Sequence, residues 1–362
     1  MNTTNIFIYL IILFLIIYIL FKYAQQKEQS AEESIQDYLL NEKGIHKNKK
    51  PILWIYIPHY YNSRHWESFG SRSSFDLNQP YIYLTIQSII QHCSDDFYIC
   101  IIDNYSFGKL LPKLSFDVNE FGNPIHYNLV VLCLLHLLYK YGGMIVPASF
   151  VCFKNLLPLY EQGTRDDKIF VGENVNRNSS SLSYLFSPDI SFMGAKMENP
   201  MIYDLIEYTQ QMISTDYTDQ SVFLGNLSKW FLNKKNVYII PAKKLGCQTT
   251  DDSVVLIDQL LEQNYILFSP KTYGIWVPAK EILERTTYQW FARLSKKQVL
   301  QGNTILSKYI LLAVAPSENV PMIKQPVEEN NWISFWKVPS DAPIWGLKPI
   351  YLGNNLLRSK DS

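Results

Sequence analysis

The sequence lacks the short motifs by which several enzyme classes are recognised. It contains no Walker phosphate loop, no GxGxxG, no GxSxG and no HExxH. These motifs provide a phosphate cradle, a dinucleotide-binding turn, an exposed nucleophile and a zinc site, respectively. Their absence leaves the ATPase, dehydrogenase, hydrolase and zinc-protease classes without support.

The chain also has no formal net charge and no cysteine or histidine clusters with metal-ligand spacing. Lysine plus arginine equal aspartate plus glutamate at 33 each, so no long-range field attracts nucleic acid. The five cysteines form no CxxC pair and the six histidines are scattered, which predicts neither a disulfide framework nor a structural zinc. The thiols are expected to be free and buried, and His126 is expected to be a core residue.

Long apolar segments are abundant. With 362 residues, 47% of them apolar, the chain can bury a large core. Residues 2–21 carry no charge, and a helix of that length spans the roughly 30 Å of a bilayer core. No basic residue precedes this run, so residues 1–22 are predicted to be an uncleaved transmembrane anchor rather than a signal peptide.

The flanking charges predict the orientation of this anchor. Lys22 and Lys27 follow the span and none precedes it, which favours a cytosolic globular domain in a single-pass membrane protein. Asn-x-Ser triplets at Asn104, Asn178 and Asn226 favour the alternative, a lumenal domain. The bilayer is thus the one partner that the sequence indicates directly.

The rest of the chain divides by composition. Residues 23–50 are polar and form a predicted stalk, 51–250 form an α/β domain, and 251–362 form a mostly helical extension with a Trp- and Pro-rich tail. Strand, helix and strand patterns alternate at the start of the domain, which is typical of a parallel sheet with functional loops after the strand ends. The predicted strands are 53–57, 97–102, 144–146, 169–171, 237–240 and 266–268, and the predicted helices are 80–90, 125–141, 280–294 and 305–314.

A family resemblance follows from several of these segments. Leu138-Tyr-Lys-Tyr-Gly-Gly-Met-Ile-Val146, Ile102-Asp-Asn104 and Phe192-Met-Gly-Ala-Lys196 together resemble the capsular-polysaccharide-synthesis and sugar-binding "DXD" glycosyltransferases. The resemblance implies a GT-A-like, Rossmann-like fold, with a mixed, mostly parallel sheet flanked by helices. It also implies a nucleotide-sugar or glycan ligand, and a substrate-binding region that includes Gly142 and Gly143.

The resemblance fails at the acidic motif. In that family, two acids after the glycine-glycine strand hold a divalent metal that neutralises the donor diphosphate. Counted from the glycines, those positions are Pro147 and Ser149 here, and an Asp-x-x-Arg pair of the preceding helix corresponds to Val131 and Leu134. Without these carboxylates no divalent metal is expected, and metal-dependent sugar transfer is not predicted.

Other residues are candidates for a ligand site. Arg64 and Arg72, in the polar segment after the first strand, are a candidate cationic clamp or simply a solvated loop. Asp103 follows the second strand and either contacts a sugar hydroxyl or caps a turn. Asp189 and Glu173 are weak candidates for a catalytic base.

Two functions are compatible with these features. The first is a membrane-anchored, glycosyltransferase-like protein without transfer activity, which binds a ligand or serves a structural role. Its composition is consistent with an AT-rich genome such as that of a large DNA virus. The alternative is an active, metal-independent glycosyltransferase. A sugar pocket filled by Phe150 and Tyr61 favours the first, and an open cleft rimmed by Arg64, Arg72 and Asp103 favours the second.

Overall fold

The computed structural model describes residues 15, 16, 18, 50–57, 79–215 and 219–315. The predicted anchor, the stalk, Arg64, Arg72, Tyr61 and the Trp-rich tail lie wholly or mostly outside this set. Within it, no helix has both the length and the apolar character needed to cross a bilayer. The described residues from 50 to 315 belong to one compact unit.

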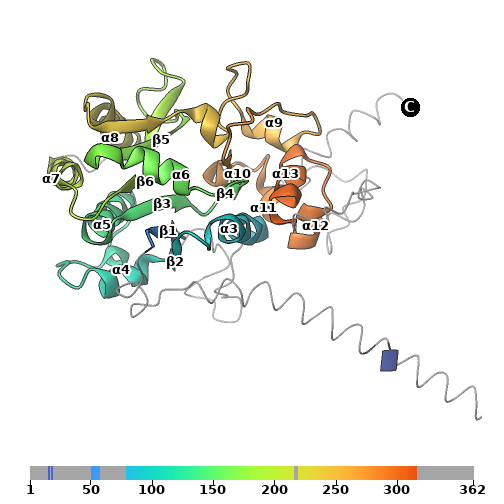
Figure 1. Cartoon of the computed structure of the whole chain (residues 1–362), viewed down its shortest axis with the longest axis horizontal. Coiled ribbons are helices and arrows are strands. Elements are labelled where there is room, and N and C mark those ends of the chain that lie inside the picture. Colours follow the sequence, from blue (N-terminus) through green and yellow to red (C-terminus); the bar gives the residue numbers. More distant parts are fainter. Residues whose placement is uncertain (1–14, 17, 19–49, 58–78, 216–218, 316–362) are drawn as a thin grey trace, which may run out of the picture. The chain divides into compact units, whose positions relative to one another are not determined.

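A mixed, mostly parallel six-stranded sheet forms the centre of this unit (Figure 1). Its strand order is β2-β1-β3-β6-β5-β7, and only β6 runs antiparallel to its neighbours. A smaller antiparallel pair, β4 and β8, lies beside it. The strands are β1 (Ile52–Tyr56), β2 (Tyr98–Ile102), β3 (Gly143–Pro147), β4 (Phe150–Cys152), β5 (Ile169–Val175), β6 (Phe186–Ala195), β7 (Val237–Ile240) and β8 (Gly274–Trp276).

Helices pack against both faces of the sheet. The α-helices are α3 (Pro80–Cys93), α4 (Asn104–Leu110), α5 (Ile125–Tyr141), α6 (Leu157–Gly163), α7 (Pro200–Thr215), α8 (Gln220–Leu232), α9 (Ile257–Leu261), α10 (Ala279–Glu284), α11 (Gln289–Ala292), α12 (Lys296–Leu300) and α13 (Ile305–Val314). In the described part of the chain, short 3-10 helices join them: η3 (Val118–Glu120), η4 (Arg165–Asp167) and η5 (Ala242–Leu245).

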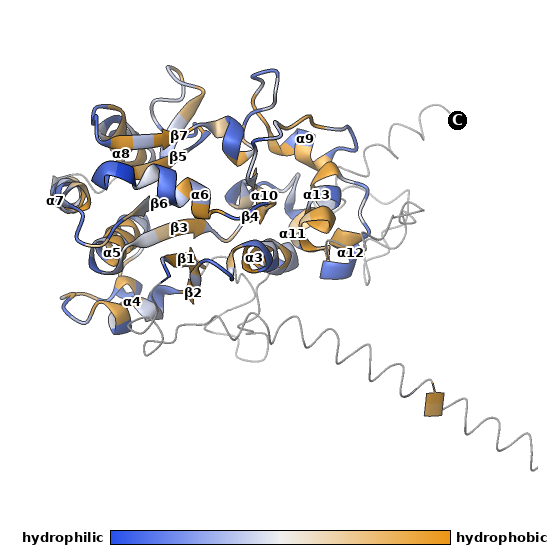
Figure 2. Ribbon diagram, viewed as in Figure 1, coloured by the Kyte–Doolittle hydropathy of each residue, from blue (hydrophilic) through white to orange (hydrophobic). Residues whose placement is uncertain are grey.

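Alternation along β1 explains why the sheet is covered on both sides. Trp54 packs into the core cluster shared with α5, α7 and α8, while Leu53 and Ile55 are equally buried and point to the opposite face because the side-chain period of a strand is two. Helix α5 carries apolar residues along much of its length (Figure 2), and ten of its seventeen residues are buried. The predicted buried helix at 125–141 is confirmed with the same bounds.

The turn between α5 and β3 requires its two glycines. Gly142 and Gly143 have φ of +66° and +94°, a region that favours residues without a Cβ. A Cβ on Gly143 would lie 2.1 Å from the carbonyl oxygen of Ile52. The close approach lets β3 pair directly with β1, where Leu53 lies opposite Met144.

Two predictions in the C-terminal part were wrong. Residues 266–268 form no strand; the Ile266 carbonyl accepts from Tyr309 Oη at 2.9 Å and the Phe268 ring packs against Tyr309, so this apolar segment anchors α13. The predicted helix 280–294 is broken into α10 and α11. The helix at 305–314 is confirmed.

The cysteine prediction is confirmed. All five thiols lie among the described residues, and each is free and buried. They occupy core positions of α3, β2, α5 and β4 and the turn after η5. They therefore act as small apolar side chains.

Candidate functional site

Several strands end at one edge of the sheet, which defines the place to look for a site. β1, β2 and β3 are parallel, and β5 runs in the same direction because β6 is antiparallel to both β3 and β5. After β1 the chain passes to β2 on one side and later to β3 on the other. Open α/β sheets bind ligands at the carboxyl ends of the strands beside such a reversal of strand order.

A first group of polar side chains, here the β2-end cluster, lies where β1 and β2 end. It consists of Tyr56, Asn104, Asn119 and His126. Tyr56 Oη donates to Asn104 Oδ1 at 2.5 Å, and Asn104 Nδ2 donates to Asn119 Oδ1 at 3.1 Å. His126 contacts the Val118 carbonyl through Nδ1 at 3.0 Å, so its ring is held in a hydrogen-bonded position at the start of α5.

The tip of β3, where the family's acids would be, is engaged by the protein itself. Ser149 is buried and its Oγ donates to the Val277 carbonyl at 2.8 Å. The Ala148 carbonyl accepts from Thr85 Oγ1 at 2.5 Å. Pro147 and Ser149 thus present no anionic oxygen, and among the described residues no group of three or more His, Cys, Asp and Glu is placed to hold a metal.

Aromatic side chains fill the space behind this tip. Phe150 is fully buried, and its ring lies 5.4 Å from that of Phe192 on β6. Phe192 in turn contacts Trp276 on β8 at 5.9 Å. The segment that follows Ser149 is therefore fixed in the protein as β4, through its pairing with β8 and the packing of Phe150.

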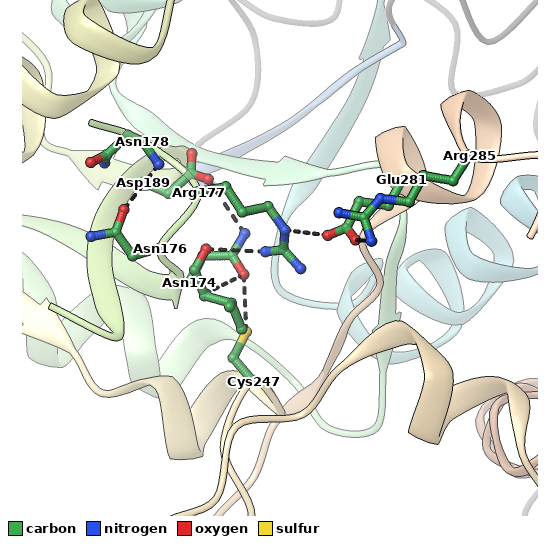
Figure 3. Close-up of polar contacts among 9 residues, drawn as sticks. Asn174, Asn176, Arg177, Asn178, Asp189, Cys247, Glu281 and Arg285 are labelled. Atoms are coloured by element: carbon green, nitrogen blue, oxygen red, sulfur yellow. Dashed lines mark hydrogen bonds and ion pairs between the residues drawn. The ribbon is translucent and has the colours of Figure 1, made fainter. Parts of the chain in front are cut away.

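A second group, here the edge cluster, lies where β5 ends and β6 begins (Figure 3). Asn174 Nδ2 donates to Asp189 Oδ2 at 3.4 Å, and Cys247 Sγ donates to Asn174 Oδ1 at 3.4 Å. The Ala242 amide donates to Glu173 Oε2 at 3.1 Å. The members of the edge cluster are Glu173, Asn174, Arg177, Asp189, Cys247 and Glu281.

Ion pairs connect this cluster to the C-terminal helices. Arg177 Nε pairs with Glu281 Oε1, and Arg285 Nη1 lies 3.4 Å from Glu281 Oε2. Arg177 also donates from Nη1 to the Val175 carbonyl at 3.0 Å. Glu281 comes from α10, so residues more than a hundred positions apart meet at this edge.

Burial shifts the titration of three groups at the edge. It raises the pKa of Glu173, although the amide of Ala242 opposes this. Burial also raises the pKa of Cys247 to about 12, against the influence of the Arg177 guanidinium. The pKa of Tyr127, in the first turn of α5, is raised mainly by burial and in addition by the Asp189 carboxylate.

The structure brings together only some of the residues that the sequence indicated. Asp189 and Glu173 lie on adjacent strands, since Gly172 is opposite Asp189 and Glu173 is opposite Pro188. Asp103 caps α4, because its Oδ1 accepts from the amide and the hydroxyl of Ser106 at 2.9 and 2.7 Å.

The paired glycines lie elsewhere. Gly142 and Gly143 are at the amino end of β3, which is the opposite edge of the sheet. Their positive φ angles and close packing against β1 account for their presence there. They therefore do not belong with the two polar clusters.

Several members of the two clusters could not be recognised from the sequence. Arg177 and Glu281 are ordinary surface residue types separated by about a hundred positions, and only the tertiary fold pairs them. Asn104 did stand out after the second predicted strand, next to Asp103. Position after a strand end was thus the one signal that pointed toward this edge.

Comparisons with known proteins find similar folds but no family. No protein-family model matches the chain, and no curated protein matches it. Among solved structures, the glycosyltransferase GlyE of Streptococcus pneumoniae TIGR4 is similar at 10% identity with a TM-score of 0.32, over 54% of this chain and 46% of that one. The PaToxG glycosyltransferase is similar at 14% identity with a TM-score of 0.28, over 57% of this chain and 80% of that one.

The matched region spans less than half of GlyE. The resemblance to the capsular and "DXD" family, which rests on the segments quoted above, stays a prediction. The strand order and the side chains at the carboxyl edge are the basis for the functional proposal that follows.

Proposed function

We propose that this chain is a membrane-tethered, glycosyltransferase-like protein that binds a sugar ligand at the carboxyl edge of its sheet and does not transfer sugar through a bound metal. The engaged tip of β3 carries this proposal. Ser149 donates to the Val277 carbonyl, and the following Phe150 is buried. A diphosphate leaving group needs cationic stabilisation worth several kcal/mol, and this segment offers no carboxylate to hold a cation.

The charges at the edge favour a neutral sugar over a diphosphate. In the described part of the chain, the carboxylates of Glu173, Asp189 and Glu281 stand against the guanidiniums of Arg177 and Arg285, which are already paired with Glu281. Amide and carboxylate oxygens such as those of Asn174 and Asp189 suit sugar hydroxyls, which both donate and accept hydrogen bonds. We therefore expect a glycan, or the sugar part of a nucleotide-sugar, as the ligand.

A metal-independent glycosyltransferase is the second candidate, favoured by one observation. Burial raises the pKa of Glu173, and carboxyls with raised pKa values at the ligand edge of a fold are candidates for acid-base catalysis. Glu173 and Asp189 lie on paired strands, one position out of register, because Glu173 is opposite Pro188 and Asp189 is opposite Gly172. In this reading one of these carboxyls takes the proton from the acceptor hydroxyl, and the cationic groups that stabilise the leaving diphosphate are Arg64 and Arg72, which lie outside the described residues.

The change in melting temperature on ligand binding can distinguish a sugar-binding protein from a metal-independent glycosyltransferase. The melting temperature of the full-length protein in detergent would be followed with a panel of neutral oligosaccharides and with UDP- and GDP-sugars, each with and without Mn²⁺. A ligand at about 100 times its Kd stabilises the native state by about 2.7 kcal/mol. For a domain of this size that corresponds to a rise of roughly 5–10 °C.

Matched variants locate the effect. Asp189→Asn should abolish the rise, while Asp204→Asn, which changes an exposed carboxylate on α7, should preserve it. Tightening that depends on Mn²⁺ would contradict the proposal. Release of nucleoside diphosphate with transfer of sugar in the presence of EDTA, lost in Glu173→Gln or Asp189→Asn, would favour the second candidate.

A further inference from the structure

The hairpin loop between β5 and β6 exposes large apolar side chains to solvent. This segment, residues 176–185 and here the 176–185 loop, projects from the sheet next to the edge cluster (Figure 1). Leu182 is 101% exposed, Leu185 67% and Tyr184 57%. Single exposed apolar residues are common on soluble proteins, but three within four positions at a loop tip are a concentrated apolar surface.

The two asparagines of the same loop, in contrast, are buried. Asn176 and Asn178 are only 8% and 7% exposed. Asn176 Nδ2 donates to the Tyr184 carbonyl at 2.9 Å and to Ser180 Oγ at 3.0 Å. Asn178 Oδ1 accepts from the Ser180 amide at 2.9 Å and from its hydroxyl at 2.7 Å.

Backbone groups of the loop are also largely satisfied within the protein. The Asn176 amide donates to the Leu185 carbonyl at 2.8 Å, and the amides of Ser183 and Tyr184 donate to the Ser180 carbonyl at 2.9 and 3.1 Å. At the tip, Ser181 and Ser183 are exposed together with the apolar side chains, so the tip presents apolar groups and small neutral hydroxyls to solvent.

The loop is fixed to the body of the protein rather than hanging from it. Asn178 Nδ2 donates to Ser228 Oγ on α8 at 3.1 Å, and the Ser179 amide donates to the Ser221 carbonyl at 3.3 Å. Ser179 also lies so close to Gly225 that a Cβ there would be 2.3 Å from its Oγ. The apolar tip is therefore presented in a defined direction.

We propose that the 176–185 loop docks into the surface of the lipid bilayer to which the chain is tethered. This inference rests on the membrane tether included in the proposed function. Residues 23–51, 29 in number, separate the predicted anchor from β1, so the body stays within about 100 Å of the membrane at full extension. A tether of this length keeps the loop at a high effective concentration near the bilayer. Shallow insertion of a few apolar side chains is then sufficient to hold the domain against the membrane surface.

The low charge of the loop indicates that it would contact the apolar interior of the membrane and not its anionic headgroups. Between Asn176 and Leu185 the one charged residue is Arg177, and its guanidinium is paired with Glu281. Docking is therefore apolar, and it should need no anionic lipid and should persist in high salt, unlike the binding of polybasic segments. Insertion of the tip would hold the edge cluster near the headgroups, where a membrane-borne glycan would be accessible.

A label at the tip tests the proposal in the full-length protein. Ser183 is exposed and the five native cysteines are buried, so Ser183→Cys can be labelled selectively with an environment-sensitive fluorophore. The protein would be reconstituted in neutral phosphatidylcholine vesicles that contain a nitroxide-bearing phospholipid. The matched control is Ser214→Cys, an exposed position near the end of α7.

The expected result is quenching at position 183 that is several times stronger than at 214 and unchanged by 0.5 M salt. Adding Leu182→Ser, Tyr184→Ser and Leu185→Ser together should reduce quenching at 183 to the level of the control. Equal quenching at the two positions, in protein that still floats with the vesicles after an alkaline wash, would overturn loop docking alone. Failure to float would overturn the tether and this inference with it.

One further outcome also counts against the proposal. If the label at 183 is shielded from aqueous iodide but not quenched by the lipid nitroxide, a protein partner or a second copy of the chain covers the tip instead of lipid.

Discussion

A carboxylate introduced at position 149 should destabilise the protein strongly and bind no metal. Ser149 is 2% exposed, and its Oγ donates to the Val277 carbonyl at 2.8 Å. Ser149→Asp places an anion against that carbonyl oxygen, in a position from which water is largely excluded. The family's acidic motif would instead require a carboxylate here to face an open site.

The magnitude follows from two contributions. Loss of the hydrogen bond costs about 1 kcal/mol, and Ser149→Ala isolates this part. An unpaired buried carboxylate adds a desolvation penalty of several kcal/mol, so we expect Ser149→Asp to cost at least about 3 kcal/mol more. Because 1 kcal/mol corresponds to about 2–4 °C for a domain of this size, the expected losses are about 2–4 °C for the alanine and roughly 8–16 °C for the aspartate variant.

The difference between the two variants should depend on pH. Burial raises the folded-state pKa of the new carboxyl above its unfolded value of about 3.9. The penalty is then fully present above the raised folded value and diminishes as the pH falls through it, because the protonated carboxyl carries no charge. The gap between Ser149→Asp and Ser149→Ala should therefore narrow between pH 7 and pH 4.5.

Thermal unfolding of the full-length variants, with and without millimolar Mn²⁺, measures all of these effects. The reasoning is refuted if Ser149→Asp melts with Ser149→Ala at neutral pH. It is refuted equally if Mn²⁺ raises the melting temperature of Ser149→Asp but not that of the wild type. Either result would mean that this position faces an open, metal-accessible site.

Three other predictions concern the edge cluster and the turn before β3. Burial raises the pKa of Glu173 above its ordinary value of 4.5, so its contribution to stability is present below that value and is lost as the pH rises through the folded pKa. Chemical denaturation between pH 4 and pH 8 should show the wild type losing stability relative to Glu173→Gln, and parallel curves would contradict this. Gly143→Ala should lower the free energy of unfolding by more than about 1–3 kcal/mol. The added Cβ would lie 2.1 Å from the Ile52 carbonyl oxygen of β1, and the residue would have to keep a φ of +94°. Gly108→Ala, with nothing within 4 Å, should instead be neutral or stabilise by up to about 1 kcal/mol; equal effects would be inconsistent with the packing described. A double-mutant cycle of Arg177→Gln and Glu281→Gln should give a coupling free energy of about 0.5–1 kcal/mol. Because the Arg177 side chain is 38% exposed, this coupling should fall with added salt. A coupling of zero would show that the ion pair is absent in solution.

Much of the fold was predictable because local patterns and global architecture agree. The continuous apolar run at 53–57 predicted a strand covered on both faces, and β1 (Ile52–Tyr56) is such a strand. The largely apolar stretch that ends at Gly142 predicted a buried helix with its correct bounds. Where the pattern was apolar but irregular, as at 266–268, the sequence could not distinguish a strand from a segment that packs against one residue of a distant helix, here Tyr309.

For the candidate site as well, some features were determined by the sequence and others only by the tertiary structure. The sequence by itself determined that Pro147 and Ser149 carry no charge, that strand and helix patterns alternate at the start of the domain, and that the cysteines form no CxxC pair. These features depend only on residue identity and short-range periodicity. Only the tertiary structure decided that Ser149 is engaged by Val277, that Arg177 meets Glu281, and that the 176–185 loop turns its asparagines inward and its leucines outward. These arrangements bring together residues that are far apart in the chain, or fix the direction in which the side chains of a loop point. The physical reason is that a hydrogen bond or ion pair depends on three-dimensional proximity, which the local sequence does not encode.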